Sequence, residues 1–434
     1  MPADSIQLLI DGRYPDPDGD GFVGVPVRCI AIENSLAGDE ADLVRQTGLT
    51  GRLAVVSDPR THEALGERIV RSLSGPGQIV SVVLGDNPHA DEDTADFLEA
   101  RTSMCDALIA VGSGTINDLC KYAAARTGKP YAVFATAPSM NGYTSSNAAI
   151  TIGGHKKSLP ASSAAGVFVD LTVLAAAPVR MIRAGLGDSS CRSTAQIDWL
   201  LSHHLFGTPY RIAPFAFLAD DEPGLLDESA ALVSGDLAAM RRLARTLILS
   251  GLGMTICGGS YPASQGEHLI SHYIDMMAPG DRREIFHGEQ IAVTTLTMAR
   301  LQESFLRSDE PPRLVATRVT REDVLDHFGP EVGDACWHEF EQKVLTLDDV
   351  DNVNERLAAS WSSVVEDCER VAVDSRRLQE VLTAVGAPTS PHSIALDTAF
   401  YNAAVEHARE LRNRYTFLDL AGDTHGLHHR GDVP

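Results

Sequence analysis

No stretch of about 18 consecutive apolar residues occurs in this chain of 434 residues, so the sequence offers no membrane-spanning helix. The seven cysteines are scattered and include no C-x-x-C pair, which favours reduced thiols over a disulfide framework. The first residues show no basic cluster followed by an apolar run, and we therefore expect no signal peptide. Together these absences predict a cytoplasmic protein.

Basic side chains are scarce: the sequence has 36 Lys and Arg against 59 Asp and Glu, and its formal net charge is −23. A charge of this sign argues against general binding to nucleic acid or to an anionic membrane surface. It leaves room for a small phosphorylated substrate, because one local group of Lys or Arg is enough to bind such a molecule. Length and composition are those of a globular protein with two domains.

Short apolar runs alternate with helical patterns up to about residue 180, and this alternation predicts a doubly wound α/β domain. The Val, Ala and Ile content of these runs suits parallel strands that are covered on both faces. The expected strands are Arg52–Asp58, Ile79–Gly85, Ala107–Gly112, Tyr131–Ala137 and Gly166–Leu171. After about Pro178 only helical patterns remain. We therefore expect an α/β domain over residues 1–180 and an all-helical domain over residues 181–434.

Four side chains have the types and spacing of a divalent metal site. His268 and His272 are four residues apart in GEHLISH and so share one face of a helix. His287, 287 − 268 = 19 residues later, can return to that face from the next helix, and Asp188 in AGLGDSS offers a carboxylate. Neutral imidazole suits Zn, Ni or Fe, and three protein ligands leave positions for water or substrate. A histidine in a helical pattern is also compatible with an ordinary core or surface role.

A strand, two closely spaced glycines and a helix indicate a dinucleotide-binding loop at residues 110–118. Gly112 and Gly114 let the backbone turn tightly beside a pyrophosphate, whose negative charge the amides of the following helix can meet. The usual fingerprint has a third glycine where this chain has Asn117, so a purely structural turn remains an alternative. Asp58, at the end of an earlier expected strand, is either an acceptor for an adenosine ribose or a simple turn residue.

Five segments that follow one another in this order resemble the sn-glycerol-1-phosphate dehydrogenases: GSGTINDLCKY, TAPSMNGYTSS, AGLGDSS, GEHLISHYIDM and FHGEQIAV. The likeness runs from about Gly51 to Leu427, and it extends to a superfamily with glycerol dehydrogenase, iron-containing alcohol dehydrogenases and 3-dehydroquinate synthase. It implies an N-terminal NAD(P)-binding domain, a helical metal-binding domain and an active site in the cleft between them. The implied reaction is the reduction of dihydroxyacetone phosphate to sn-glycerol 1-phosphate, catalysed by a homo-oligomer.

The resemblance also assigns roles to individual residues. Asp188, His268 and His287 match the metal ligands, with zinc the first choice and nickel or iron the alternatives. His272 would touch the substrate, relay a proton or support the site from behind. The matches to cofactor-contacting positions are Gly112, Gly114, Thr115 and Asp118 at the pyrophosphate, and Thr136 and Ser139 at the nicotinamide. The sequence itself offers Lys156 and Lys157, in GGHKKSLP, as candidates for contact with the substrate phosphate or the nicotinamide, and a solvated basic turn is the alternative for at least one of them.

One departure from the family keeps the substrate open. The family segment usually reads Ser-Met-Asp-Gly-Tyr, whereas this chain has Asn141, which forms hydrogen bonds but carries no charge and cannot take a proton. The alternatives are a glycerol or other polyol dehydrogenase, a dehydroquinate-synthase-like cyclase and a catalytically silent binding protein. Asp188 argues against the cyclase, whose family pattern has Glu at the first metal ligand. The choice between NAD and NADP also stays open, because Asp58 disfavours a 2′-phosphate while Arg60 lies beside it.

Overall fold

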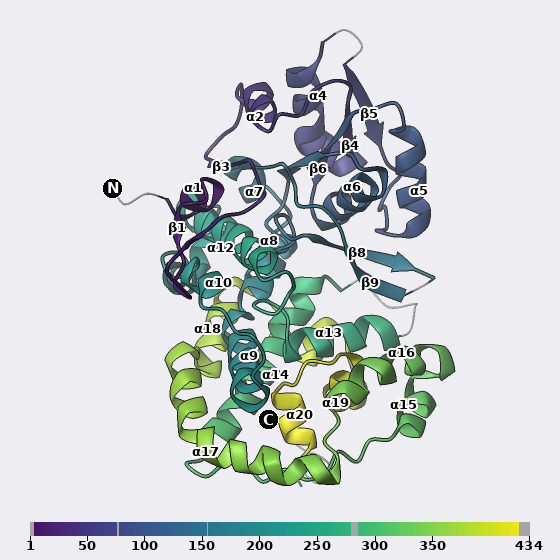
Figure 1. The fold of residues 1–434 in the computed structure, drawn as a ribbon. Coiled ribbons are helices and arrows are strands. Elements are labelled where there is room, and N and C mark those ends of the chain that lie inside the picture. Colours follow the sequence, from purple (N-terminus) through teal and green to yellow (C-terminus); the bar gives the residue numbers. More distant parts are fainter. Residues whose placement is uncertain (1–3, 76–77, 154, 279–284, 425–434) are drawn as a thin grey trace. The chain divides into compact units, whose positions relative to one another are not determined.

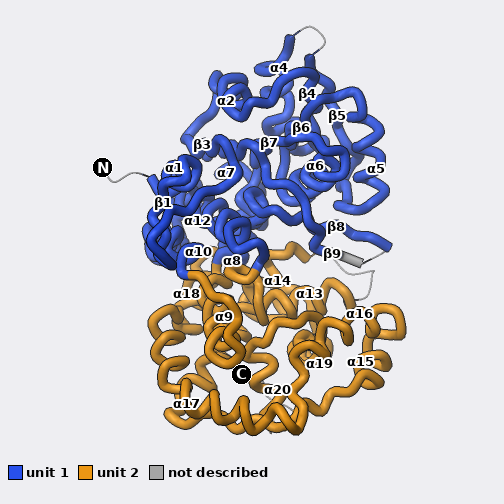
Figure 2. Tube along the Cα trace, in the orientation of Figure 1, with its two compact units in different colours: residues 1–189, 212–260 blue, residues 190–211, 261–434 orange. Residues whose placement is uncertain are grey.

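The computed structural model describes residues 4–75, 78–153, 155–278 and 285–424 (Figure 1). Contacts between Cα atoms group the chain into two compact units (Figure 2). Unit 1 comprises residues 1–189 and 212–260, and unit 2 comprises residues 190–211 and 261–434. The predicted division at residues 180–181 follows secondary structure, whereas the contact units group the helices of residues 212–260 with the strands.

Unit 1 contains a six-stranded sheet in which all neighbouring strands are parallel. The strands are β3 (Cys29–Glu33), β4 (Leu53–Ser57), β5 (Ile79–Val83), β6 (Ala107–Gly112), β7 (Tyr131–Ala135) and β10 (Gly166–Asp170). Their order across the sheet is β3-β10-β7-β6-β4-β5. The five predicted strands are confirmed to within two residues at each end, and with them the predicted α/β class. The edge strand β3, which precedes the alternating pattern, was not predicted.

The central strands β4, β6, β7 and β10 are buried at every residue. Alternate side chains such as Val55 and Ile109 pack in one core with Val44 of helix α2 (Glu40–Gln46) and Ile69 of helix α4 (Glu67–Leu73). The intervening side chains are equally buried, and helix α6 (Gly114–Thr127) packs against β6 and against helix α5 (Glu92–Arg101). Burial on both sides explains why these strands are continuous apolar runs in the sequence.

The strand order reverses between β4 and β6. Strand β5 follows β4 on one side, and β6, β7 and β10 then follow on the other. In open parallel sheets, ligands bind outside the carboxyl ends of the strands at such a reversal. Asp58 directly follows β4, and Ser113 and Gly114 directly follow β6. The fold of unit 1 therefore carries both predicted cofactor-binding segments to the ends of these two strands.

The remaining elements of unit 1 are two hairpins and several helices. Two antiparallel pairs were not predicted: β1 (Tyr14–Pro15) with β2 (Phe22–Val23), and β8 (Asn147–Ile152) with β9 (His155–Pro160). The helices are α1 (Ser5–Ile10), α3 (Pro59–Thr61) with a π-helical turn at His62–Gly66, α7 (Leu171–Ala175), α8 (Val179–Ser189), α10 (Ala213–Ala216), α11 (Glu222–Asp227), a 3-10 turn at Ser229–Ser234 and α12 (Leu237–Ile256).

Among the described residues of unit 2, helices and short 3-10 turns are connected by loops and no strand occurs, as predicted for the C-terminal part. Its helices are α9 (Arg192–Phe206), α13 (Gly266–Met277), α14 (His287–Leu306), α15 (Arg321–Phe328), α16 (Pro330–Phe340), α17 (Leu347–Val371), α18 (Ser375–Val385), α19 (Thr398–His407) and α20 (Phe417–Gly422). Short 3-10 turns lie at Glu341–Lys343, Pro391–Ile394 and Ala408–Leu411. Helix α14 is buried along most of its length because α9, α13, α17, α18 and α20 contact it.

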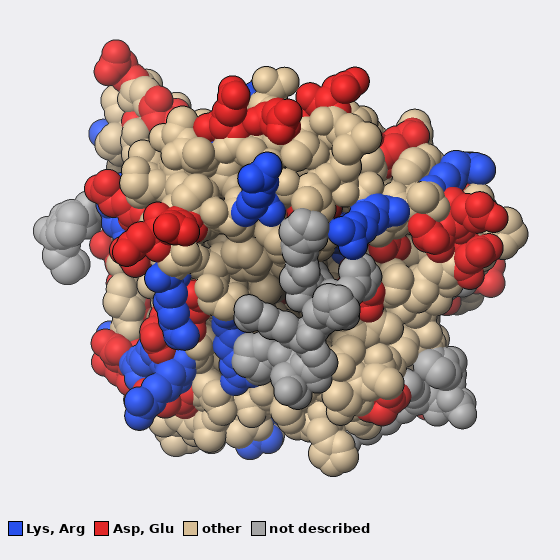
Figure 3. Space-filling view, turned by 90° about the horizontal axis from the view of Figure 1, so that it is seen from below, with Lys and Arg blue, Asp and Glu red and all other residues tan. Residues whose placement is uncertain are grey.

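Among the described residues, no helix is both long enough and apolar enough to cross a membrane. On the face of the molecule in Figure 3, basic side chains stand in separate groups among acidic ones. Positive charge is therefore dispersed on this face, in keeping with the excess of acidic residues in the sequence.

The turn from β6 into α6 predicts a steric requirement for Gly112. A Cβ atom at Gly112 would lie 2.5 Å from the Cβ of Ile116, whereas one at Gly114 would lie 3.5 Å from its nearest neighbour, the Cγ of Met140. We therefore expect Gly112→Ala to lower the free energy of unfolding by about 1–3 kcal/mol, the usual effect of overpacking. Urea denaturation measures this loss with Gly114→Ala as the control, and equal midpoints for the two variants would contradict it.

Candidate cofactor and metal site

The predicted dinucleotide loop has the backbone geometry that an anion requires. Helix α6 begins at Gly114, and its N-cap residue Ser113 makes no side-chain capping hydrogen bond. The amides of the first helical turn therefore lack the side-chain acceptor that usually satisfies them. Ser113, Gly114 and Thr115 are all partly exposed, while Gly112 is buried at the end of β6. This arrangement suits a negatively charged group bound at the helix N-terminus.

Behind this loop, Asp118 and Lys121 connect α6 to the segment that follows β7. The Asp118 carboxylate accepts a hydrogen bond from the Ala149 amide of β8 at 3.3 Å and from the Asn117 side chain at 3.1 Å. Lys121 is fully buried, and its Nζ donates to the carbonyl oxygens of Gly142 at 2.6 Å and Asn147 at 2.9 Å. Burial lowers the pKa of the Lys121 ammonium, and the nearby Asp118 opposes that shift. Asn117, in place of a third glycine, is completely buried.

Asp58 has a structural partner of its own. Its Oδ1 accepts hydrogen bonds from the backbone amides of Arg60 and Thr61, each at 2.9 Å, so the carboxylate caps helix α3. In turn, the Thr61 hydroxyl accepts a hydrogen bond from the backbone amide of Asp58 at 3.0 Å. The turn role considered for Asp58 is thus present, and its ribose-binding role stays a prediction.

Two glycines allow the loop after β7 to lie close to helices α8 and α12. A Cβ atom at Gly185 of α8 would lie 1.6 Å from the carbonyl oxygen of Pro138. At Gly251 of α12 it would lie 2.5 Å from the carbonyl oxygen of Asn141. Thr136, which is buried, continues from β7 and donates its backbone amide to the Gly112 carbonyl at 3.1 Å. Ser139 is half-buried in the same loop.

Asn141 contacts the predicted metal ligand of unit 1. Its backbone amide donates to Oδ2 of Asp188 at 2.8 Å, and its side-chain amide donates to the hydroxyl of Ser250 on α12 at 3.3 Å. Asp188 lies in the last turn of α8 and is almost completely buried. The loop therefore fixes the Asp188 carboxylate through a main-chain group, which any residue type at position 141 except proline would provide.

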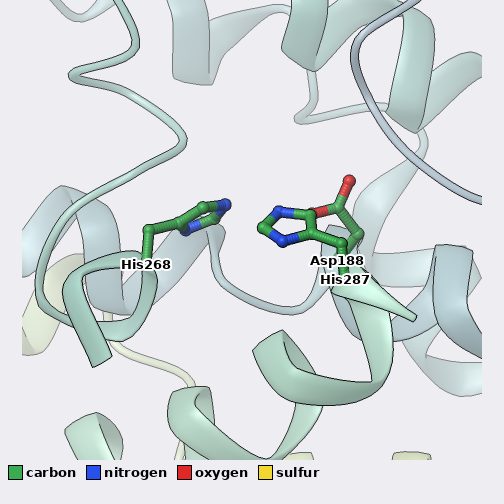
Figure 4. Close-up of side chains that lie close together, drawn as sticks. All are labelled: Asp188, His268 and His287. Atoms are coloured by element: carbon green, nitrogen blue, oxygen red, sulfur yellow. The ribbon is translucent and has the colours of Figure 1, made fainter. Parts of the chain in front are cut away.

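In unit 2, α13 and α14 bring His268 and His287 together. The centroids of the two imidazole rings are 5.1 Å apart, and one nitrogen of each ring lies within 4.8 Å of the other. Figure 4 draws these two rings, which turn towards each other, along with Asp188 of unit 1. Nitrogen ligands of one zinc ion lie about 2.0–2.1 Å from the metal, so only a small adjustment would let both rings hold one ion. The donor set therefore fits the predicted divalent metal.

Glu267 determines which nitrogen of His268 is available. The Nδ1 atom of His268 lies 2.9 Å from Oε1 of Glu267, and the carboxylate is completely buried. A carboxylate only accepts hydrogen bonds, so Nδ1 carries the proton and Nε2 presents its lone pair. Glu267 is itself held by the Gln265 amide at 2.8 Å and by the Thr194 hydroxyl at 3.2 Å. Glu267 was not predicted from the sequence, although it stands directly before His268 in GEHLISH.

Cys191 lies beside Glu267 and His268. Its sulfur is within 4.8 Å of ligand atoms of both side chains. The sulfur is also 3.6 Å from the carbonyl oxygen of Ala263, and the side chain is buried.

Two other predicted residues are less well defined. His272 lies one turn along α13, half-buried, with its ring centroid 6.3 Å from that of His268. Lys156 belongs to strand β9 and pairs with Thr151, but its side chain lies outside the described part of the structure. The roles predicted for these residues stay predictions.

The chain is similar in sequence to known dehydrogenases. A family model described as iron-containing alcohol dehydrogenase matches residues 31–178. The glycerol-1-phosphate dehydrogenase [NAD(P)+] of Bacillus licheniformis is 27% identical over 401 residues, which cover 91% of this chain and 88% of that one. The enzyme of the same name from Thermococcus kodakarensis is 30% identical over 274 residues, covering 63% of this chain and 77% of that one.

The chain belongs to the glycerol-1-phosphate dehydrogenase family. Its fold is that of a wider group: the crystal structure of maleylacetate reductase from Agrobacterium tumefaciens superposes with a TM-score of 0.57 at 17% identity. That match covers 89% of this chain and 90% of the other. The predicted dehydroquinate-synthase-like architecture and the family resemblance are therefore confirmed.

In this family member, a second buried carboxylate supports α13 behind Glu267. Asp198 of α9 accepts hydrogen bonds from the amides of Gly266 and Phe417, both at 2.9 Å, and from the Gln302 side chain at 3.1 Å. Burial, followed by the negative charge of Glu267, raises the pKa of Asp198 from 3.8 to about 8, although the three hydrogen bonds oppose the shift.

The raised pKa of Asp198 predicts a pH dependence of stability. Between about pH 4 and pH 8 the folded protein keeps a proton that the unfolded chain releases, so the contribution of Asp198 falls as the pH rises through this window. We expect Asp198→Asn, which cannot titrate, to show a shallower decline of the urea midpoint from pH 5 to pH 8 than the wild type. Parallel declines in the two proteins would contradict the shifted pKa.

Proposed function

We propose that this protein reduces dihydroxyacetone phosphate to sn-glycerol 1-phosphate with NADH or NADPH and one divalent metal. The observation that carries the proposal is the oriented histidine pair on α13 and α14, in a chain whose relatives bear the name glycerol-1-phosphate dehydrogenase. The metal ligands would be Asp188, His268 and His287. Zinc is the first choice, with nickel and iron as alternatives.

When bound, the metal would supply a Lewis acid for the carbonyl oxygen and the nicotinamide would supply a hydride. The chain's own residues would orient these groups. Glu267 keeps the proton of the neutral His268 imidazole on Nδ1, and the Asn141 amide fixes one oxygen of Asp188. His272, one turn from His268, would contact the substrate or relay a proton. Asn141 would add a neutral hydrogen-bonding group beside the substrate hydroxyls.

The dinucleotide would lie at the strand-order reversal of unit 1. The uncapped first turn of α6, at Gly114 and Thr115, would bind the pyrophosphate through its amides. Gly112 and Asp118 would shape this loop from behind, Thr136 and Ser139 would line the nicotinamide, and Lys156 would approach the nicotinamide or the substrate phosphate. Asp58 would accept hydrogen bonds from the adenosine ribose with the oxygen that does not cap α3, and so favour NAD over NADP.

The cellular setting is part of the same proposal. None of the seven cysteines, all of them described, forms a disulfide, and six of them are buried, which supports a reducing compartment such as the cytoplasm. A homo-oligomeric state, implied by the family resemblance, also stays a prediction.

The proposed reaction is tested by oxidation of NADH and NADPH with dihydroxyacetone phosphate, run beside unphosphorylated dihydroxyacetone. The enzyme is first stripped of metal and then reloaded with Zn, Ni or Fe. We expect turnover with the phosphate, dependent on added metal and faster with NADH than with NADPH. Turnover only with dihydroxyacetone would instead assign a polyol dehydrogenase, and turnover with neither would overturn the proposal.

Removal of a proposed ligand gives a second test. His268→Ala and Asp188→Ala should each weaken metal binding by more than about 100-fold, the upper end of the loss for an outer-shell partner, and abolish turnover that excess metal does not restore. His204→Ala is the matched control, because His204 of α9 pairs with Asp367, 3.0 Å away, within unit 2. Full activity in either ligand variant would remove that residue from the metal site.

The cofactor loop is tested by a methyl group at Gly114. A Cβ atom there meets only ordinary contacts within the protein, so Gly114→Ala should fold normally. It should nevertheless weaken NADH binding by about tenfold, or about 1.4 kcal/mol, because the methyl group stands where the pyrophosphate approaches. Gly85→Ala, whose Cβ would meet nothing within 4 Å, is the control. An unchanged affinity for NADH in Gly114→Ala would show that the pyrophosphate binds elsewhere.

A further inference from the structure

We infer that a hydrogen-bond relay from Asp275 through Gln290 and Ser271 fixes the tautomer of His287, so that its Nε2 atom is the metal-binding nitrogen. The inference rests on the proposed function, because it assigns positioning residues to the proposed metal ligand. It goes beyond the ligand set itself, because none of these three residues would touch the metal.

The two helices place the members of the relay in register. Ser271 and Asp275 are four residues apart on α13, and His287 and Gln290 are three apart on α14, so each pair shares one helix face. Ser271 is completely buried and Gln290 is 2% exposed, whereas Asp275 is exposed at the outer end. The inner members are therefore shielded from water, which would otherwise exchange their hydrogen-bond directions.

The first link orients the amide of Gln290. Its Nε2 lies 2.7 Å from Oδ1 of Asp275. An ionised carboxylate only accepts hydrogen bonds, so the group of Gln290 that faces Asp275 is the NH2. The other end of the amide, the carbonyl oxygen Oε1, must then face Ser271. Asp275 thus removes the freedom of Gln290 to present either end of its amide.

The second link uses the one proton of Ser271. The Ser271 hydroxyl lies 2.6 Å from Oε1 of Gln290, and it donates there because that oxygen only accepts. Its remaining contact, 3.5 Å from Nδ1 of His287, can then only be one in which serine accepts. A hydrogen bond in this direction requires Nδ1 of His287 to carry the proton. The neutral imidazole consequently presents an unprotonated Nε2.

Both histidines thus reach the same state by different means. Glu267 accepts the Nδ1–H of His268 directly, at 2.9 Å. At His287 the acceptor is Ser271, whose hydrogen-bond direction is set by Asp275 through Gln290. The opposite tautomer of His287 would point an N–H at the metal and remove one ligand. Partners that orient ligating histidines typically contribute 10–100-fold in metal affinity, and we expect about tenfold here because the last link is long.

The test measures the tautomer and the metal affinity separately. Histidine-labelled ¹⁵N NMR of the metal-free full-length enzyme identifies the protonated nitrogen of His287, assigned with His287→Gln. Competition with a chelator measures the affinity for Zn²⁺. Wild type should show Nδ1–H at His287, and Ser271→Ala should lose this preference and bind Zn²⁺ about tenfold more weakly. Thr294→Val is the matched control, since it removes another buried hydroxyl of α14 whose contact is its own helix, at the Ile291 carbonyl.

A charge-conserving double variant tests the direction of the relay. Asp275→Asn alone lets Gln290 turn its amide over, which reverses Ser271 and favours the wrong tautomer. Adding Gln290→Glu restores an acceptor that faces Ser271. The new carboxylate also accepts a hydrogen bond from the side-chain amide that Asp275→Asn introduces, so the double variant should recover the wild-type tautomer and the wild-type affinity for Zn²⁺. This pair decides the matter even where Ser271→Ala does not fold.

The outcomes separate this inference from the proposed function. A wild-type enzyme that binds no Zn²⁺, Ni²⁺ or Fe²⁺ would overturn the proposed metal site, while its NMR spectrum would still report the tautomer. Metal binding that is equal in wild type and a folded Ser271→Ala, with Nδ1–H retained at His287 in both, would overturn the relay. Failure of Gln290→Glu to correct Asp275→Asn would overturn it as well.

Discussion

The buried carboxylate of Asp198 is the interaction on which the helical unit depends. Three donors converge on it from the start of α13, from α14 and from the start of α20. A buried carboxylate destabilises the fold unless its oxygens are hydrogen-bonded, so the four segments must keep one relative arrangement. Gly266, which begins α13, is one of the donors, and His268 follows two residues later. The position of the proposed ligand is thus determined by a polar contact one layer behind it.

In unit 1, the buried ionisable group is Lys121. Lys121 is enclosed by carbonyl and hydroxyl oxygens from residues 142–147, and its burial is compatible with a charge because these oxygens replace water. The same loop contacts α8 and α12 where Gly185 and Gly251 leave space for its backbone. Asn141 reaches Asp188 only because both constraints hold the loop. In each unit, therefore, a fully buried ionisable side chain positions the residues proposed for catalysis.

The sequence was informative where a single element carries the signal. Five strands were predictable because their burial on both faces leaves continuous apolar runs. The proximity of His268 and His287 was predictable from their spacing on successive helices. Long-range partners were not predictable. Asp198 and Phe417 are 219 positions apart in the sequence, and no local pattern indicates their hydrogen bond. The assignment of helices to the two units was not predictable either. Helix α12 has an ordinary helical pattern, and only its contacts assign it to unit 1.

Asn141 shows why a departure from a family pattern needs the structure for its interpretation. From the sequence, the loss of an acid suggests a change of substrate. In the structure its backbone amide holds Asp188 and its side chain donates to Ser250. An aspartate would keep the first contact and could only accept in the second, with the serine hydroxyl as donor. The substitution therefore leaves the proposed ligand in place and changes the charge beside it, so its effect should fall on substrate preference rather than on metal binding.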